Sequence, residues 1–164
     1  MQTRNKNYFI ISWSAAYLKL VQVIDSAAGY TVHVRGAYAL HTLSEETCAE
    51  KIRQAYDACG RDTQVYVFVS RKNVIVRFLE MPSVTPAEIR NMVALQITQH
   101  VPYAPAEMQY DLVSYPSRKE GYSQVVLTAI SSSECERIVR ACTRAAVPLD
   151  LLTVTSWGIL AAYR

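Results

Sequence analysis

The sequence lacks a hydrophobic run long enough to cross a membrane. No stretch approaches the ~18 apolar residues that a spanning helix needs. A secretory signal is also absent, because Arg4 and Lys6 are followed by a strand-like run without a small-residue cleavage site. These absences predict a cytoplasmic protein that reaches a membrane only through a partner.

The sequence also lacks the patterns typical of metal and disulfide sites. Its four cysteines form no CxxC pair, and the cysteine and histidine spacings match no zinc motif. Cys135 and Cys142 fall on one expected helix at a separation of ~10 Å, which is too far for a disulfide. We therefore expect buried thiols in a reducing compartment, with no metal and no cofactor.

Charge and histidine placement give no sign of nucleic-acid binding or catalysis. The net charge is +3, and the basic residues are scattered rather than gathered on one face. His33, His41 and His100 have no cysteine, serine or carboxylate at a recognised motif spacing, although folding can bring distant residues together. We expect a protein that is not an enzyme and does not bind nucleic acid.

The composition provides ample material for a hydrophobic core. The chain has 164 residues, of which 51% are hydrophobic and 19% are charged. These proportions exclude a disordered chain and suit one compact domain with a small insertion.

Apolar periodicity predicts three strands at the start of the chain, at 8–14, 18–24 and 30–38. Their short connections indicate an antiparallel meander. Residues 64–69 form a further strand that is apolar on both faces, which predicts a central position with helices covering both sides.

A helix over 44–59 separates the meander from that central strand. Ser44 can cap its start, acidic residues favour its first turn, and Gly60 suits its end. Cys48, Ile52 and Ala55 recur at helical spacing with Cys59 and predict its buried face.

The second half of the chain predicts a small α/β module and a return to the main sheet. Capping boxes at Thr85–Glu88 and Ser133–Glu136 mark two helix starts. The expected buried positions are Ile89, Val93 and Ile97 in the first helix, and Ile138, Cys142 and Ala145 in the second. The expected strands are 74–81, 107–115, 123–130 and 150–154, and a last helix begins over 156–164.

Residues 8–24 are the most informative stretch, because they read as two apolar strands joined by a tight turn. Actin-like ATPases carry a phosphate-binding hairpin of the same position and shape, with the motif Asp-x-Gly-x-Ser/Thr-x-Lys. With Lys19 aligned on the motif lysine, Ser12 replaces the aspartate and Ser14 replaces the glycine. The frame is kept, whereas the residues that bind phosphate and Mg²⁺ are lost.

Nearly the whole chain resembles the N-terminal half of PilM-type proteins, the actin-like cytoplasmic proteins of type IV pilus assembly. The cytoplasmic domain of the type II secretion protein GspL is a close competitor. The segments that carry the resemblance are 18–21, 77–82, 88–89, 99–103, 110–111 and 145–150.

The resemblance implies an α/β fold, an actin-like (ribonuclease H-like) mixed sheet with an inserted small α/β subdomain. It assigns residues 1–70 and 146–164 to subdomain 1A, and residues 71–145 to the inserted subdomain 1C. The second actin-like lobe, which forms the other wall of the nucleotide cleft, is absent. We therefore expect either a fragment or a gene that stops early.

The hairpin predicts a degenerate phosphate site. Residues 14–17 place four side chains where a Gly-rich turn lets the backbone approach an anion. Ser12 cannot supply the charge of a carboxylate, and Lys19 alone is typical of a solvated side chain. We expect Mg-ATP to bind weakly or not at all.

In the resembled family, a short cytoplasmic peptide of an inner-membrane protein of the PilN type lies in a groove between 1A and 1C. The candidate partner-binding residues here are Met92, Gln96, His100, Pro102 and Tyr103. Aromatic side chains beside rigid prolines suit peptide capture. In the alternative, Tyr103 packs on the core beside an ordinary helix end, and both interpretations stay open.

The resemblance therefore predicts a scaffold peripheral to the inner membrane, which docks the cytoplasmic tail of a PilN-type partner without ATP hydrolysis and has the assembly ATPase as a further candidate partner. One alternative is a GspL-like domain that binds the secretion ATPase. Another is an actin-like ATP-binding protein completed by a missing second lobe. An unrelated ribonuclease H-like hydrolase would need clustered carboxylates, which residues 8–24 lack.

Overall fold

The computed structural model describes residues 6–60 and 62–156, and the chain divides into two compact units. Unit 1 comprises Met1–Asn73 with Arg137–Arg164, and unit 2 comprises Val74–Glu136. The assignment of these units to subdomains 1A and 1C stays a prediction.

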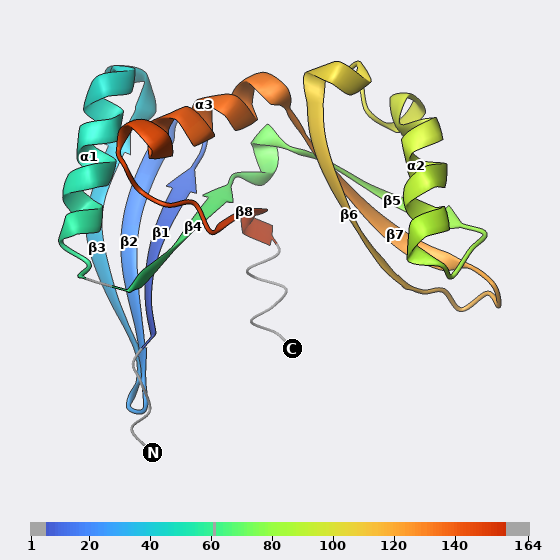
Figure 1. The fold of residues 1–164 in the computed structure, drawn as a ribbon, viewed down its shortest axis with the longest axis horizontal. Coiled ribbons are helices and arrows are strands. Elements are labelled where there is room, and N and C mark those ends of the chain that lie inside the picture. The colour runs from blue at the N-terminus through green and yellow to red at the C-terminus, as the bar shows by residue number, and fades with distance from the viewer. Residues whose placement is uncertain (1–5, 61, 157–164) are drawn as a thin grey trace. The chain divides into compact units, whose positions relative to one another are not determined.

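Unit 1 is built on a five-stranded mixed sheet in the order β3-β2-β1-β4-β8 (Figure 1). The first three strands form the predicted antiparallel meander, and β4 and β8 extend the sheet in parallel with β1. A parallel neighbour needs a crossover, which α1 provides between β3 and β4. The strands are β1 (Lys6–Trp13), β2 (Tyr17–Ser26), β3 (Gly29–Ala39), β4 (Thr63–Val69) and β8 (Leu151–Val154).

Helix α1 (Glu45–Asp57) begins as the sequence predicts. The Ser44 hydroxyl accepts a hydrogen bond from the Thr47 N–H at 3.1 Å, which satisfies one free donor of the first turn. Cys48, Ile52 and Ala55 are buried against the sheet, as their spacing indicated. The helix ends two residues before the predicted position, and Gly60 follows in the left-handed region with φ +88°.

Helices α1 and α3 (Ser132–Arg144) lie on the same face of the sheet, over the buried side chains of Trp13 and its neighbours. Strand β4 was expected to be covered on both faces, and this expectation is wrong for the described residues. Val65 and Val67 are buried, whereas Tyr66 and Phe68 on the other face are only half-buried. The strand therefore alternates, as a strand with one covered face does.

Unit 2 contains a three-stranded antiparallel sheet in the order β5-β7-β6, with α2 on one face (Figure 1). The predicted stripe of Ile89, Val93 and Ile97 packs on Val125 and Leu127 of the central strand. The elements are β5 (Ile75–Met81), α2 (Pro86–His100), β6 (Met108–Pro116) and β7 (Ser123–Ser131). Three 3₁₀ turns complete the described fold, at Leu40–Thr42, Arg71–Asn73 and Pro105–Glu107.

Neither predicted capping box forms. Thr85 makes no side-chain cap, and Glu88 instead accepts a hydrogen bond from the Ser83 hydroxyl at 2.6 Å. The Ser83 hydroxyl also accepts the Thr85 N–H, so a residue two positions earlier organises the start of α2. At α3 the cap is Ser131, whose hydroxyl accepts the Glu134 N–H at 3.3 Å.

The chain passes between the two units at two points, and the subdomain boundaries expected at 70/71 and 145/146 stay a prediction. The first point lies after Asn73, and the second lies after Glu136, inside α3 rather than beyond it. Ile138, Cys142 and Ala145 are buried as predicted, and this burial accounts for assigning most of α3 to unit 1. The final helix predicted over 156–164 lies, from residue 157 onward, outside the described residues.

Candidate functional site

The predicted phosphate hairpin is formed by β1, β2 and the turn between them. Ser12 on β1 lies directly opposite Lys19 on β2, on the face of the sheet away from α1. Ser14 begins the turn, and Ala15 to Tyr17 are exposed. The structure thus places the three predicted residues together at one end of the hairpin.

The turn already uses its own backbone donors. The Ser14 hydroxyl accepts hydrogen bonds from the N–H groups of Tyr17 at 2.8 Å and Ala16 at 3.3 Å. It also lies 3.0 Å from the Tyr17 carbonyl, to which it donates, and the Ser14 N–H donates to the same carbonyl. A phosphate binds such a turn through free N–H groups, so it would have to displace a serine hydroxyl that holds them.

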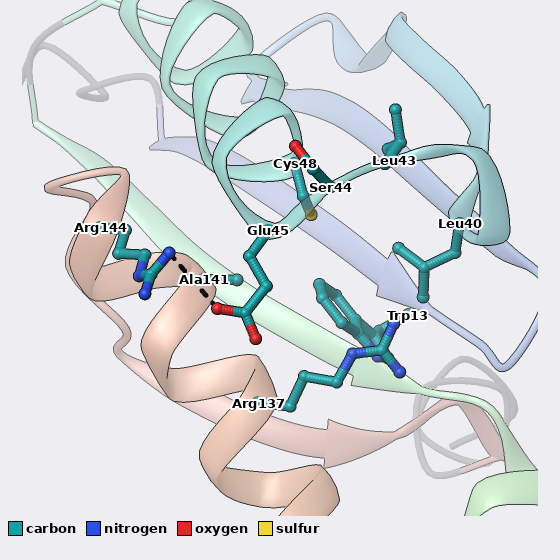
Figure 2. A pocket seen from close by; sticks show the side chains of 9 residues that line it. All are labelled: Trp13, Leu40, Leu43, Ser44, Glu45, Cys48, Arg137, Ala141 and Arg144. Atoms are coloured by element: carbon teal, nitrogen blue, oxygen red, sulfur yellow. Dashed lines mark ion pairs between the residues drawn. The ribbon is translucent and has the colours of Figure 1, made fainter.

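A small cavity lies where β1 ends, between the first turn of α1 and α3 (Figure 2). Its volume of about 30 Å³ has room for roughly one or two water molecules and none for a nucleotide. The lining residues are Trp13, Leu40, Leu43, Ser44, Glu45, Cys48, Arg137, Ala141 and Arg144.

Charge in this cavity is largely compensated. The Glu45 carboxylate lies 3.3 Å from an Arg144 nitrogen and 3.9 Å from an Arg140 nitrogen, and Figure 2 shows Glu45 reaching toward Arg144. The Arg137 guanidinium lies 5.4 Å from the centre of the Trp13 ring. The sequence prediction missed this cluster, although the arginines recur at spacings of three and four on α3.

The buried thiols are poor nucleophiles. Burial raises the pKa of Cys48, and burial together with the nearby Cys48 raises the pKa of Cys142 to about 11. Arg137 opposes the shift at Cys48 without reversing it. Both thiols are therefore protonated at neutral pH, which disfavours covalent catalysis at this point.

The candidate partner-binding residues all fall in unit 2. Met92, Gln96 and His100 are half-buried and follow each other at spacings of four along α2, so they form one flank beside the buried stripe. Tyr103 and Met92 pack on the core of unit 2, while Pro102 is exposed. The Arg77 Nε donates to the His100 carbonyl at 3.0 Å and fixes the end of the helix. We name Met92, Gln96 and His100 the α2 flank.

In the described part of the chain, neither a metal site nor a membrane-spanning helix is found, and two of the histidines are exposed. Within residues 6–60 and 62–156, no three His, Cys, Asp or Glu side chains gather in a way that could hold a metal ion. His33 and His41 are exposed on β3 and on the turn that follows it. No described helix is both long and apolar enough to span a membrane.

Comparison with known proteins identifies the fold. No known protein family and no curated protein matches the sequence. Among solved structures, the chain is similar to PilM in the PilM-PilN type IV pilus biogenesis complex, with a TM-score of 0.69 and 17% identity. That match covers 94% of this chain and 49% of the solved chain.

A second similar structure is the cytoplasmic domain of EpsL, an inner membrane component of the type II secretion system of Vibrio cholerae. The TM-score is 0.63 at 10% identity, and the match covers 91% of this chain and 57% of that domain. This chain therefore spans about half the length of each solved chain. The expected fold class, an actin-like mixed sheet with a smaller α/β module, is confirmed.

Proposed function

We propose that this protein is a docking module of a type IV pilus assembly machine, which binds a short cytoplasmic segment of an inner-membrane protein and does not hydrolyse ATP. The observation that carries the proposal is the fold, because the similarity to PilM, a protein solved with its partner PilN, extends over nearly the whole chain. In this role the protein is cytoplasmic and peripheral to the inner membrane. A protein partner of the PilN type is its ligand, and the assembly ATPase is a candidate second partner.

The geometry of the hairpin supports docking without hydrolysis. An ATPase needs free backbone donors and an acidic residue that organises Mg²⁺. Here the Ser14 hydroxyl occupies two turn N–H groups, and the residue in the aspartate position is Ser12. The β1–β2 hairpin can therefore serve as a rigid support, while its turn no longer binds phosphate.

The α2 flank is our candidate contact for the partner. Half-buried side chains on a rigid helix lose little conformational entropy when a peptide covers them. Tyr103 packs on the core of unit 2, so we assign it two roles: it supports the flank, and its exposed part contributes to the peptide contact. Exposed Pro102 fixes the backbone where the chain leaves the helix.

A crosslinked pull-down from native membranes, read by mass spectrometry, tests the proposal. We expect the tagged protein to recover a pilus inner-membrane protein with a short cytoplasmic N-terminus. Recovery of type II secretion components would support the second candidate, a GspL-like domain that binds the secretion ATPase, which the similarity to EpsL favours. Recovery of soluble metabolic proteins alone would contradict both candidates.

A third candidate is an actin-like ATP-binding protein whose site is completed by a second lobe. The occupied hairpin turn argues against it, since a second lobe would not free the N–H groups that Ser14 holds. Micromolar binding of Mg-ATP would favour this candidate over docking.

A further inference from the structure

Strand β3 is the longest strand described and forms one edge of the sheet of unit 1. Within the described residues it has a single neighbour, β2. Every residue from 29 to 35 is exposed. An edge strand of this kind presents unpaired N–H and C=O groups that can template the addition of another strand.

The exposed side chains of β3 are apolar on one face. Tyr30, Val32 and Val34 alternate along the strand and are 76%, 60% and 73% exposed. Val32 and Val34 lie directly opposite Val23 and Val21 of β2, so the apolar surface continues from the sheet to its edge. Addition of a strand here would bury these side chains as well as satisfy the backbone.

The first half of β3, residues 29–34, carries none of the prolines, lysines or bulges that protect a sheet edge, and the one irregularity of the strand lies at Arg35. Across residues 29–39 the only charged residue is Arg35. Its Nε lies 3.2 Å from the Gln22 Oε1, and one of its terminal nitrogens lies 3.2 Å from the Ala58 carbonyl. The guanidinium of Arg35 therefore points back over the sheet and not outward from its edge. The pairing of β3 with β2 shifts register only at Arg35, so residues 29–34 pair regularly.

We propose that two copies of this protein pair through β3, antiparallel and about a two-fold axis, to form one sheet across both copies. A two-fold contact uses the same patch on each copy, so the patch must be complementary to itself. The first half of β3 meets this requirement because it carries no charged residue that would face the same residue of the second copy.

The side chains select the register of this pairing. With Val32 on the two-fold axis, Val32 meets its own copy and Tyr30 meets Val34 of the other copy. On the opposite face Thr31 meets His33, and no like charges oppose each other. An axis at His33 would instead place Tyr30 opposite Gly36, which offers no side chain for the ring to pack on.

The pairing is expected to be weak. A pair of seven-residue strands is only ~24 Å long, so its contact area falls in the range of transient interfaces. The dimer should therefore depend on concentration and reverse on dilution.

Sedimentation velocity of the whole chain from about 10 µM to about 1 mM tests the proposal. The wild type should show a reversible monomer–dimer equilibrium, and Val32→Lys should weaken it at least about tenfold because two lysines meet at the axis. Leu95→Lys is the matched control, because Leu95 is 84% exposed on α2 in unit 2 and should leave the equilibrium unchanged. Circular dichroism confirms that each variant is folded.

Disulfide trapping tests the register. In a Cys135→Ser background, Val32→Cys should crosslink to its own copy under mild oxidation, and Leu95→Cys should not. A wild type that stays monomeric throughout would overturn the proposal, including the case in which the edge receives a strand from another protein. A dimer that Val32→Lys leaves unchanged, or equal crosslinking of both cysteine variants, would also overturn it.

Discussion

Gln22 is a buried polar residue whose side chain hydrogen-bonds to several elements of unit 1. It is only 3% exposed, and its side-chain amide nitrogen donates to the Asn7 Oδ1 at 2.9 Å and to the Cys59 carbonyl at 3.1 Å. Its oxygen accepts from Arg35 of β3. One side chain thus links the first three strands to the end of α1, where helix carbonyls need donors.

Replacing Gln22 with leucine should destabilise the protein by about 2–3 kcal/mol. The substitution preserves most of the volume, but it takes from the half-buried Asn7 Oδ1 the donor that Gln22 supplies, and it removes the Gln22 bonds to the Cys59 carbonyl and to Arg35. Urea unfolding measures the loss. Gln54→Leu, at an exposed position on α1, should change stability by less than about 0.5 kcal/mol. Equal effects of the two substitutions would show that the network contributes nothing.

The buried thiol of Cys142 should make stability fall at high pH. Its pKa is raised from 9.0 to about 11 in the folded state, chiefly by burial. Above pH 9 the unfolded chain releases this proton while the folded chain keeps it, so the stabilisation is complete below pH 9 and is lost as pH rises toward 11.

Comparison of the wild type with Cys142→Ala isolates this effect from the titration of tyrosine and lysine. Between about pH 8 and about pH 10.5, urea unfolding should show a steeper loss of stability for the wild type than for the variant. Identical slopes would mean that Cys142 titrates alike in both states.

At the scale of elements, strands and helices follow from periodicity, whereas their caps do not. The meander and the buried stripes of α1 and α2 follow from apolar spacing. The sequence predicts Ser133 as the cap of α3, but the helix already begins at Ser132, and the hydroxyl of Ser131 at the end of β7 caps it instead. Ser83 displaces Thr85 for the same reason, because the backbone before the helix sets which hydroxyl is within reach.

The α2 flank supports a prediction with a control on the same helix. Gln96 is half-buried on the flank, whereas Asn91 is exposed on the other side of the same helix. Gln96→Ala should weaken binding of a partner peptide about fivefold because it removes a contact at the centre of the flank. Asn91→Ala should have no effect.

Fluorescence polarisation measures both variants against a labelled peptide from the N-terminus of the protein recovered in the pull-down. Equal affinities of Gln96→Ala and wild type would remove the α2 flank as the contact. Tyr103→Ala is a less useful probe, because Tyr103 also packs on the core of unit 2.

At the scale of the whole molecule, the sequence predicts the fold better than the site. The order of elements and the Ser12 and Ser14 replacements are legible along the chain. The hydrogen bonds that the Ser14 hydroxyl accepts within the turn cannot be predicted from the sequence, because they depend on the geometry of the folded hairpin. The cluster around Glu45 joins residues that lie far apart in the sequence, so spacing alone could not reveal it.

Titration calorimetry tests most directly whether this protein is a docking module or a nucleotide-binding one. We would titrate the chain with Mg-ATP and, separately, with the N-terminal peptide of the inner-membrane protein recovered in the pull-down. We expect saturable binding of the peptide and no binding of Mg-ATP up to about 1 mM. Micromolar binding of Mg-ATP without binding of the peptide would contradict this expectation.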